Sequence, residues 1–83
     1  MFFISYFSLE SLKVSLWTID DVANFIRKIH NVKAVVQVFI RNEIDGRSFM
    51  KLTVDELTRH PYNLPGGPAK NIFEEIQKLQ RGH

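Results

Sequence analysis

The stretch EIDGRSFMKLTVDEL, residues 43–57, contains two helix starts only eight residues apart. Each start has an apolar residue, then a capping residue, then a second apolar residue five positions after the first. The two sets are Ile44-Asp45 with Phe49, and Leu52-Thr53 with Leu57. The capping side chain accepts a hydrogen bond from a backbone N–H, and the apolar pair fixes the angle between the chain and the helix. Two starts this close predict central helices of only one or two turns.

The same pattern recurs upstream at Trp17-Thr18 with Val22, which predicts a helix start after Thr18. Apolar residues at helical spacing support this helix after Thr18. They also predict a short helix that ends near Arg41 and a longer one near the end of the sequence. The last helix is expected to begin at Gly67-Pro68, with proline at its first position, where no backbone donor is needed. The residues expected in the core are Trp17, Phe25, Ile26, Phe39, Ile44, Phe49, Leu52, Leu57, Ile72 and Ile76.

Length and composition limit the chain to one small globular domain. It has 83 residues, of which 45% are hydrophobic and 24% are charged. The absence of cysteine excludes disulfides, thiolate zinc sites and thiol chemistry, and favours an intracellular protein. The net charge of +2 is weak support for nucleic-acid binding, which needs basic residues concentrated on one face.

The first residues differ in character from the rest. Residues 1–9 are rich in aromatic and aliphatic side chains, but no apolar run approaches the roughly 20 residues of a membrane-spanning helix. The segment also has no basic start and no small-residue cleavage site of a signal peptide. We therefore expect residues 1–15 to be an apolar extension that packs its aromatics on the domain or stays frayed, and residues 16–81 to be the domain.

A set of short motifs, in order and at fixed spacing, resembles the sterile alpha motif (SAM) domain family. They are Trp17-Thr18, Asp21-Val22, Phe25-Ile26, Phe39, Glu43-Ile44-Asp45-Gly46, Phe49, Leu52-Thr53, Glu56-Leu57, Gly67-Pro68-Ala69 and Ile72. The resemblance runs from about Trp17 to Leu79. The segments at residues 43–46 and 67–69 look most similar to the domains of Polycomb-group and malignant-brain-tumour-type chromatin proteins, and that likeness implies a nuclear location.

The resemblance implies an all-α, compact five-helix bundle with short central helices and a longer C-terminal helix. It also implies association with another SAM domain, of the same or a different kind, through two unlike surfaces. We name the predicted residues at the start of the last helix the end-helix surface: Leu64, Gly67, Pro68, Lys70 and Asn71. We name the predicted acidic residues of the central segment the mid-loop surface: Glu43, Asp45 and Asp55.

The residues offer a physical reason for such a pairing. Gly67 and Pro68 have no side chain that caps the last helix, so we expect backbone N–H groups near Ala69 and Lys70 to point outward at the positive end of the helix dipole. The mid-loop surface supplies carboxylates, although Asp45 is expected to cap its own helix. Two unlike surfaces that fit head to tail produce open polymers or a defined hetero-pair.

RNA binding through a basic face near the start of the last helix is the alternative function. The residues that would form this face are Lys51, Arg59 and Lys70. A continuous patch of these three side chains, without acidic residues between them, would favour this alternative.

No pattern in the sequence predicts an enzyme. The histidines His30, His60 and His83 share no metal-binding spacing with acidic residues. The segment Gly66-Gly67-Pro68-Ala69-Lys70 lacks the glycine spacing and the Lys-Ser/Thr pair of a phosphate-binding loop. We therefore expect no catalytic residue, metal, cofactor, small-molecule substrate or membrane partner.

Overall fold

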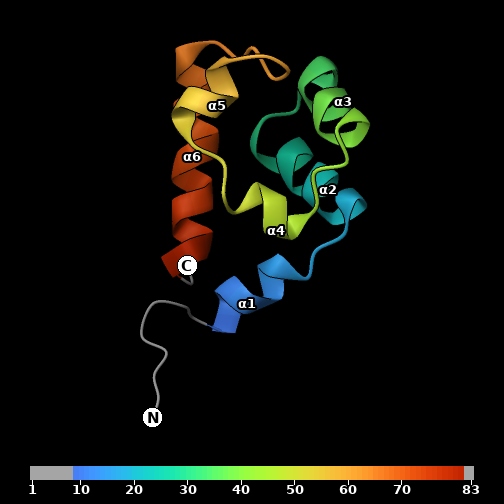
Figure 1. Cartoon of the computed structure of the whole chain (residues 1–83), viewed down its shortest axis with the longest axis vertical. Helices are drawn as coiled ribbons and strands as arrows, with labels where there is room; N and C mark the ends of the chain where they lie inside the picture. Colours follow the sequence, from blue (N-terminus) through green and yellow to red (C-terminus); the bar gives the residue numbers. More distant parts are fainter. Residues whose placement is uncertain (1–8, 82–83) are drawn as a thin grey trace.

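The computed structural model describes residues 9–81, and within this range all regular secondary structure is helical (Figure 1). The helices are α1 Leu9–Ser15, α2 Ile19–Ile29, α3 Lys33–Arg41, α4 Gly46–Phe49, α5 Val54–Thr58 and α6 Gly66–Arg81. The long α6 forms one side of the molecule, α2 and α3 form the opposite side, and α4 lies between them. The predicted all-α class is confirmed, with short central helices and a longer last helix. The described range holds six helices rather than five.

The predicted caps start three of these helices. Thr18 Oγ1 accepts from the Asp21 N–H at 3.1 Å, and Asp21 Oδ2 accepts from the Thr18 N–H at 3.0 Å. Thr53 and Glu56 form the same reciprocal pair at the start of α5. Each reciprocal pair satisfies two backbone donors that a helix leaves without partners. Asp45 caps α4 in the predicted way as well, so both central helices have a side-chain cap although each is only about one turn long.

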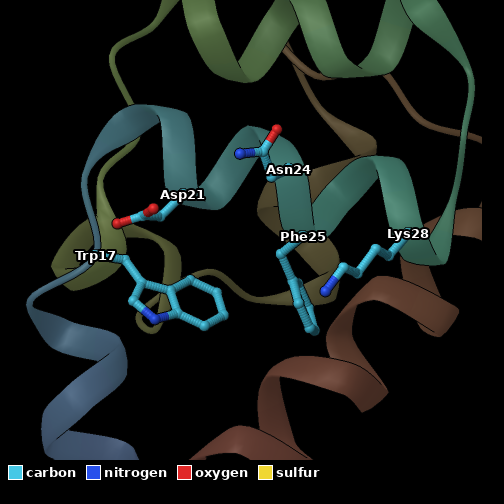
Figure 2. A pocket seen from close by; sticks show the side chains of 5 residues that line it. All are labelled: Trp17, Asp21, Asn24, Phe25 and Lys28. Atoms are coloured by element: carbon cyan, nitrogen blue, oxygen red, sulfur yellow. The ribbon is translucent and has the colours of Figure 1, made fainter.

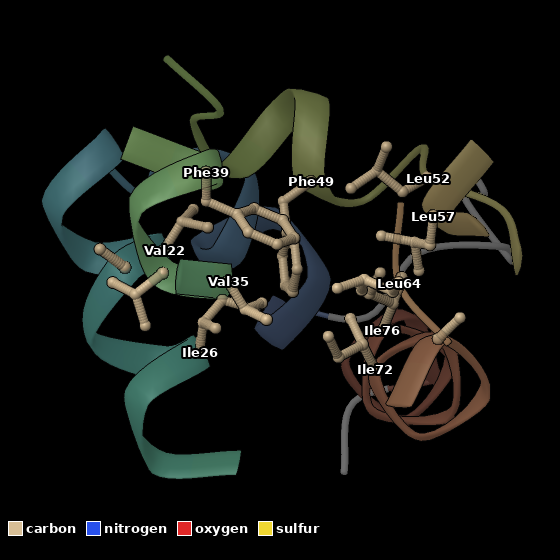
Figure 3. Packing of buried hydrophobic residues seen from close by; sticks show 13 residues of the cluster. Val22, Ile26, Val35, Phe39, Phe49, Leu52, Leu57, Leu64, Ile72 and Ile76 are labelled. Atoms are coloured by element: carbon tan, nitrogen blue, oxygen red, sulfur yellow. The ribbon is translucent and has the colours of Figure 1, made fainter. Parts of the chain in front are cut away.

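The core joins α2 and α3 to α6. Phe39 and Phe49 lie at its centre, with Val22 and Ile26 of α2 on one side and side chains of α6 on the other (Figure 3). A series of neighbouring rings crosses the molecule through Trp17, Phe25, Phe49, Phe39 and Tyr62, with centroid separations of 5.2–6.1 Å. The predicted core residues all belong to this cluster or pack against it, with Trp17, Phe25 and Ile44 only half-buried.

Helix α1 lies within the segment that the sequence analysis assigns to an extension. Val14 of this helix is buried, with 3% of its surface exposed, and α1 contacts both α6 and α4. Residues 9–15 therefore pack against the helical bundle as a sixth helix. The remainder of the expected extension, residues 1–8, lies outside the described residues.

Gly46 makes the close approach of this N-terminal region possible. The Gly46 N–H donates to the Trp17 carbonyl at 3.0 Å. A Cβ at position 46 would collide with the carbonyl oxygen of Val14 and would lie 2.9 Å from the Cβ of Trp17. Only a residue without a side chain fits here, so Gly46 has a packing role in addition to its place in a turn.

Candidate protein-interaction surfaces

The start of α6 is the centre of the end-helix surface. The first helical bond runs from the Ala69 N–H to the Pro65 carbonyl at 3.0 Å, so the expectation of a free N–H at Ala69 is wrong. In a regular helix the Lys70 N–H likewise bonds to the Gly66 carbonyl. The backbone donors ahead of the first helical bond belong to Gly66 and Gly67, because Pro68 has none.

The surroundings of this helix start are open. A Cβ built at Gly66 or Gly67 would meet no described atom within 4 Å, apart from those of its chain neighbours and its own helix. Lys70 is exposed, and so is Asn71, whereas Ala69 before them is fully buried. The exposed lysine and the positive end of the α6 dipole therefore belong to the same end of the helix, which suits an acidic partner.

Leu64 differs from its prediction as a surface residue. Only 6% of Leu64 is exposed, and its side chain belongs to the core cluster (Figure 3). Its backbone N–H donates to the Leu57 carbonyl at 2.9 Å, which holds the residue against the end of α5. Burial of an aliphatic side chain is favourable, so Leu64 supports the start of α6 from inside and is not a contact residue of the end-helix surface.

The mid-loop surface has two acidic residues close together in the connection between α3 and α4. Glu43 and Asp45 are both exposed. Asp45 Oδ1 accepts from the Ser48 N–H at 3.0 Å and caps α4, as predicted. This backbone hydrogen bond, aided by the Ser48 hydroxyl, lowers the pKa of the Asp45 carboxyl below its ordinary value of 3.8. The lowered pKa favours the ionised form of Asp45, so this exposed residue carries a negative charge on the surface.

Glu43 has an unusual backbone conformation. Its φ of 54° lies in the left-handed region, where glycine is the usual residue. The Glu43 N–H bonds to the Ile40 carbonyl at 3.0 Å, and the Ile44 N–H bonds to the Phe39 carbonyl at 3.1 Å. These two bonds form a Schellman motif that ends α3. The motif turns the chain out of α3 and leaves the Glu43 carboxylate on the surface.

Asp55 does not lie with the other two acidic residues. It is in α5, which packs on α6, and Figure 1 shows α5 well separated from the connection that carries Glu43 and Asp45. Asp55 Oδ2 is 3.2 Å from Arg59 Nη2, one helical turn away. The sequence could have predicted this ion pair, because Asp55 and Arg59 are four residues apart on one helix. The structure thus brings together Glu43 and Asp45 but leaves Asp55 apart.

The same ion pair bears on the basic face of the RNA-binding alternative. Arg59 is one of its three residues, and the carboxylate of Asp55 lies directly beside the guanidinium. RNA binding through this face requires a basic patch without acidic residues, and Asp55 beside Arg59 does not fit that requirement. An acidic neighbour reduces the attraction of this site for phosphate groups.

A surface hollow of about 300 Å³ lies along one side of α2 (Figure 2). The residues that line it are Trp17, Asp21, Asn24, Phe25 and Lys28. Its two aromatic rings already pack against each other in a tilted arrangement, with centroids 5.3 Å apart and an angle of 51° between their planes. Among residues 9–81 there is no group of three or more histidine, aspartate or glutamate side chains placed to hold a metal ion. No helix in that range is long and apolar enough to span a bilayer.

The sequence profile of the SAM-like domain matches residues 4–78, which is most of the chain. The chain belongs to the SAM-like domain family. Polyhomeotic-proximal chromatin protein of Drosophila melanogaster is 34% identical to this SAM-like domain over 70 residues. Lethal(3)malignant brain tumor-like protein 4 of Mus musculus is 28% identical over 68 residues. These relatives are similar along 81% and 82% of the chain, and the matched part is 4% and 11% of their own length.

Two solved structures are also similar to this SAM-like domain. A polyhomeotic SAM domain structure superposes with a TM-score of 0.72 and 33% sequence identity, covering 80% of this chain and 93% of that one. The hetero SAM domain structure of Ph and Scm gives a TM-score of 0.71 and 34% identity, covering 78% of this chain and 97% of that one. The predicted family and its Polycomb-group likeness are confirmed by these similarities.

Proposed function

We propose that this SAM-like domain is a protein–protein interaction module that docks onto another SAM domain, either a second copy or the domain of a related protein. The observation that carries the proposal is its similarity, at a TM-score of 0.71, to a chain from a structure in which two different SAM domains are paired. The family and the relatives support a binding role, and we propose no catalytic activity.

The proposed contact joins the end-helix surface, without Leu64, to the mid-loop surface. Gly67, Pro68, Lys70 and Asn71 would present the open start of α6 and one ammonium group. Glu43 and Asp45 would present two exposed carboxylates. Opposite charges on separate elements support a head-to-tail arrangement, because one copy can offer its basic end to the acidic connection of the next.

Asp55 has a different place in this proposal. Its pairing with Arg59 and its position on α5 make it a neighbour of the α6 side of the molecule. We propose that it contributes at most a rim contact, where exposed charges add little to affinity.

Sedimentation velocity over a range of concentrations tests the proposal. We expect the chain to form complexes larger than a monomer, alone or when mixed with the polyhomeotic SAM domain. Lys70→Glu is expected to abolish or strongly reduce this association because it reverses the charge of the end-helix surface. Lys33→Glu is the matched control, since it makes the same charge change at an exposed residue on α3. Monomers in every mixture, or equal effects of the two substitutions, would contradict the proposal.

We further propose that the domain works in a nuclear chromatin regulator. The support is the name of the similar Drosophila protein, a chromatin protein. Fractionation of cells that express the chain tests this: recovery with chromatin is expected, and recovery from the cytosol alone would contradict it.

A further inference from the structure

Two apolar side chains are exposed at the end of α1, and the residue that follows them lines the hollow beside α2; we treat these residues together as one candidate docking surface. Leu16 is 81% exposed, and Leu12, one helical turn before it, is 52% exposed. Trp17 follows Leu16 directly and lines the hollow with Phe25. Figure 2 shows the Trp17 ring, which comes from the segment before α2, and the Phe25 ring of α2 on the same side of that helix. Exposed apolar side chains beside a hollow lined by half-buried rings are typical of a docking surface.

We propose that residues 1–8 of the same chain dock on this surface, crossing Leu12 and Leu16 and placing aromatic side chains against Trp17 and Phe25. The segment reads MFFISYFS and has five large apolar or aromatic residues after Met1. It contains no charged side chain, so it can pack on an apolar surface without burying a charge. Aromatic rings placed against Trp17 would extend the row of rings that crosses the core.

The segment is long enough to reach the hollow. Helix α1 has seven residues, so its length is about 10 Å. Eight extended residues span up to about 26–29 Å, which is enough to turn back along α1 and reach Trp17. A short tether on the same chain also gives an effective concentration in the millimolar range. The tethered segment therefore occupies the surface in preference to a second copy present at lower concentration.

Trp17 supplies the measurement because it is the single tryptophan of the chain. The test compares the 83-residue chain with a variant that carries Phe2→Ser, Phe3→Ser and Phe7→Ser together. We expect the variant to show a red-shifted tryptophan emission and stronger quenching by acrylamide, because its indole is uncovered. Val32→Ser is the control, since Val32 is an exposed apolar residue at the start of α3. This control should leave the emission unchanged.

The conditions separate this proposal from the proposed association of SAM domains. Emission is measured at concentrations where sedimentation shows only monomers, and circular dichroism verifies that each variant is folded. A second measurement needs no substitution: in the wild-type chain we expect nuclear Overhauser contacts between the Trp17 indole and residues 2–7. Equal quenching of wild type and triple variant, together with absence of these contacts, would overturn the proposal. Protection of Trp17 that grows with protein concentration would assign the surface to a second copy and would also overturn it.

Discussion

Gly46 and Glu43 lie three residues apart, and the backbone at each of these positions favours glycine, for different reasons. Gly46 has no room for a Cβ because the Val14 carbonyl and Trp17 occupy that space. Glu43 has a left-handed backbone, with φ of 54°, that favours glycine, yet it carries a carboxylate. A non-glycine residue in this conformation costs about 1–2 kcal/mol. Substitution of either residue therefore tests how the connection between α3 and α4 is built.

Gly46→Ala is expected to lower the free energy of unfolding by about 1–3 kcal/mol, the range for forcing an extra carbon into a packed site. Thermal or urea unfolding measures the effect. Gly66→Ala is the matched control, because a Cβ there meets nothing within 4 Å. Equal stability of the two variants would contradict the close approach described for Gly46.

Glu43→Gly is expected to raise the free energy of unfolding by about 1 kcal/mol, because glycine adopts the left-handed conformation without steric cost. Glu43→Ala removes the same carboxylate but keeps the unfavourable conformation. The comparison of the two variants by urea unfolding separates backbone strain from charge. A glycine variant no more stable than the alanine variant would show that the conformation carries no cost.

Asp45 gives a prediction for acidic pH. Its pKa is lowered in the folded state, so its contribution to stability is present above the ordinary value of 3.8 and is lost as the pH falls through the folded value. Asn is also a good N-cap, so Asp45→Asn keeps the cap and removes the titration. The stability of this variant should fall less than that of wild type between about pH 5 and pH 2. The free energy of unfolding is measured with urea at each pH. If it fell equally with pH in wild type and in Asp45→Asn, the stabilising role assigned to the Asp45 carboxylate would be contradicted.

At the scale of elements, α1 is the part that differs most from the expectation. The sequence analysis assigns residues 1–15 to an extension because the first nine residues are apolar and aromatic and the resemblance to the SAM family begins only at about Trp17. The contact that holds α1 is made by Val14, one buried side chain facing elements distant in the sequence. Contacts of this kind are decided by tertiary packing, which periodicity over seven residues does not reveal.

Val14→Ala tests whether α1 is part of the folded bundle. We expect the free energy of unfolding to fall by about 2 kcal/mol, because the substitution removes the two buried methyl groups of Val14. Val32→Ala makes the same chemical change at a residue that is 44% exposed, and it should have a much smaller effect. If both substitutions had the same small effect on urea unfolding, α1 would not contribute to the stability of the domain.

The other elements follow from local signals to different degrees. The starts of α2, α4 and α5 are predicted by their caps, since each cap involves residues only three positions apart. The sequence predicts that α6 begins at Gly67-Pro68 with Pro68 in the first helical position. The helix in fact begins at Gly66, so Pro68 occupies the third position. Proline is tolerated there because the third N–H has no partner within the helix either. The burial of Leu64 depends on its contact with α5, and no spacing rule signals it.

At the scale of the whole molecule, the two proposed surfaces lie on different elements. Lys70 is near the start of α6, and Glu43 and Asp45 are in the connection between α3 and α4, on the other side of α4 (Figure 1). Each head-to-tail contact uses only one of the two surfaces of a chain. The other surface stays free to bind a further copy, so the assembly can continue to grow. The sequence resemblance supplied the idea of two surfaces, whereas the structure decided which residues are exposed on each.

Mixing two charge-reversal variants is the most direct test of head-to-tail docking for a chain that self-associates. Lys70→Glu disables the end-helix surface, and Glu43→Lys disables the mid-loop surface without removing the Asp45 cap. Each variant alone should sediment as a monomer, because every contact needs one intact surface of each kind. An equimolar mixture should form complexes of two chains, one of each variant, because each variant keeps one intact surface. A mixture that stays monomeric while the wild type associates would contradict head-to-tail docking.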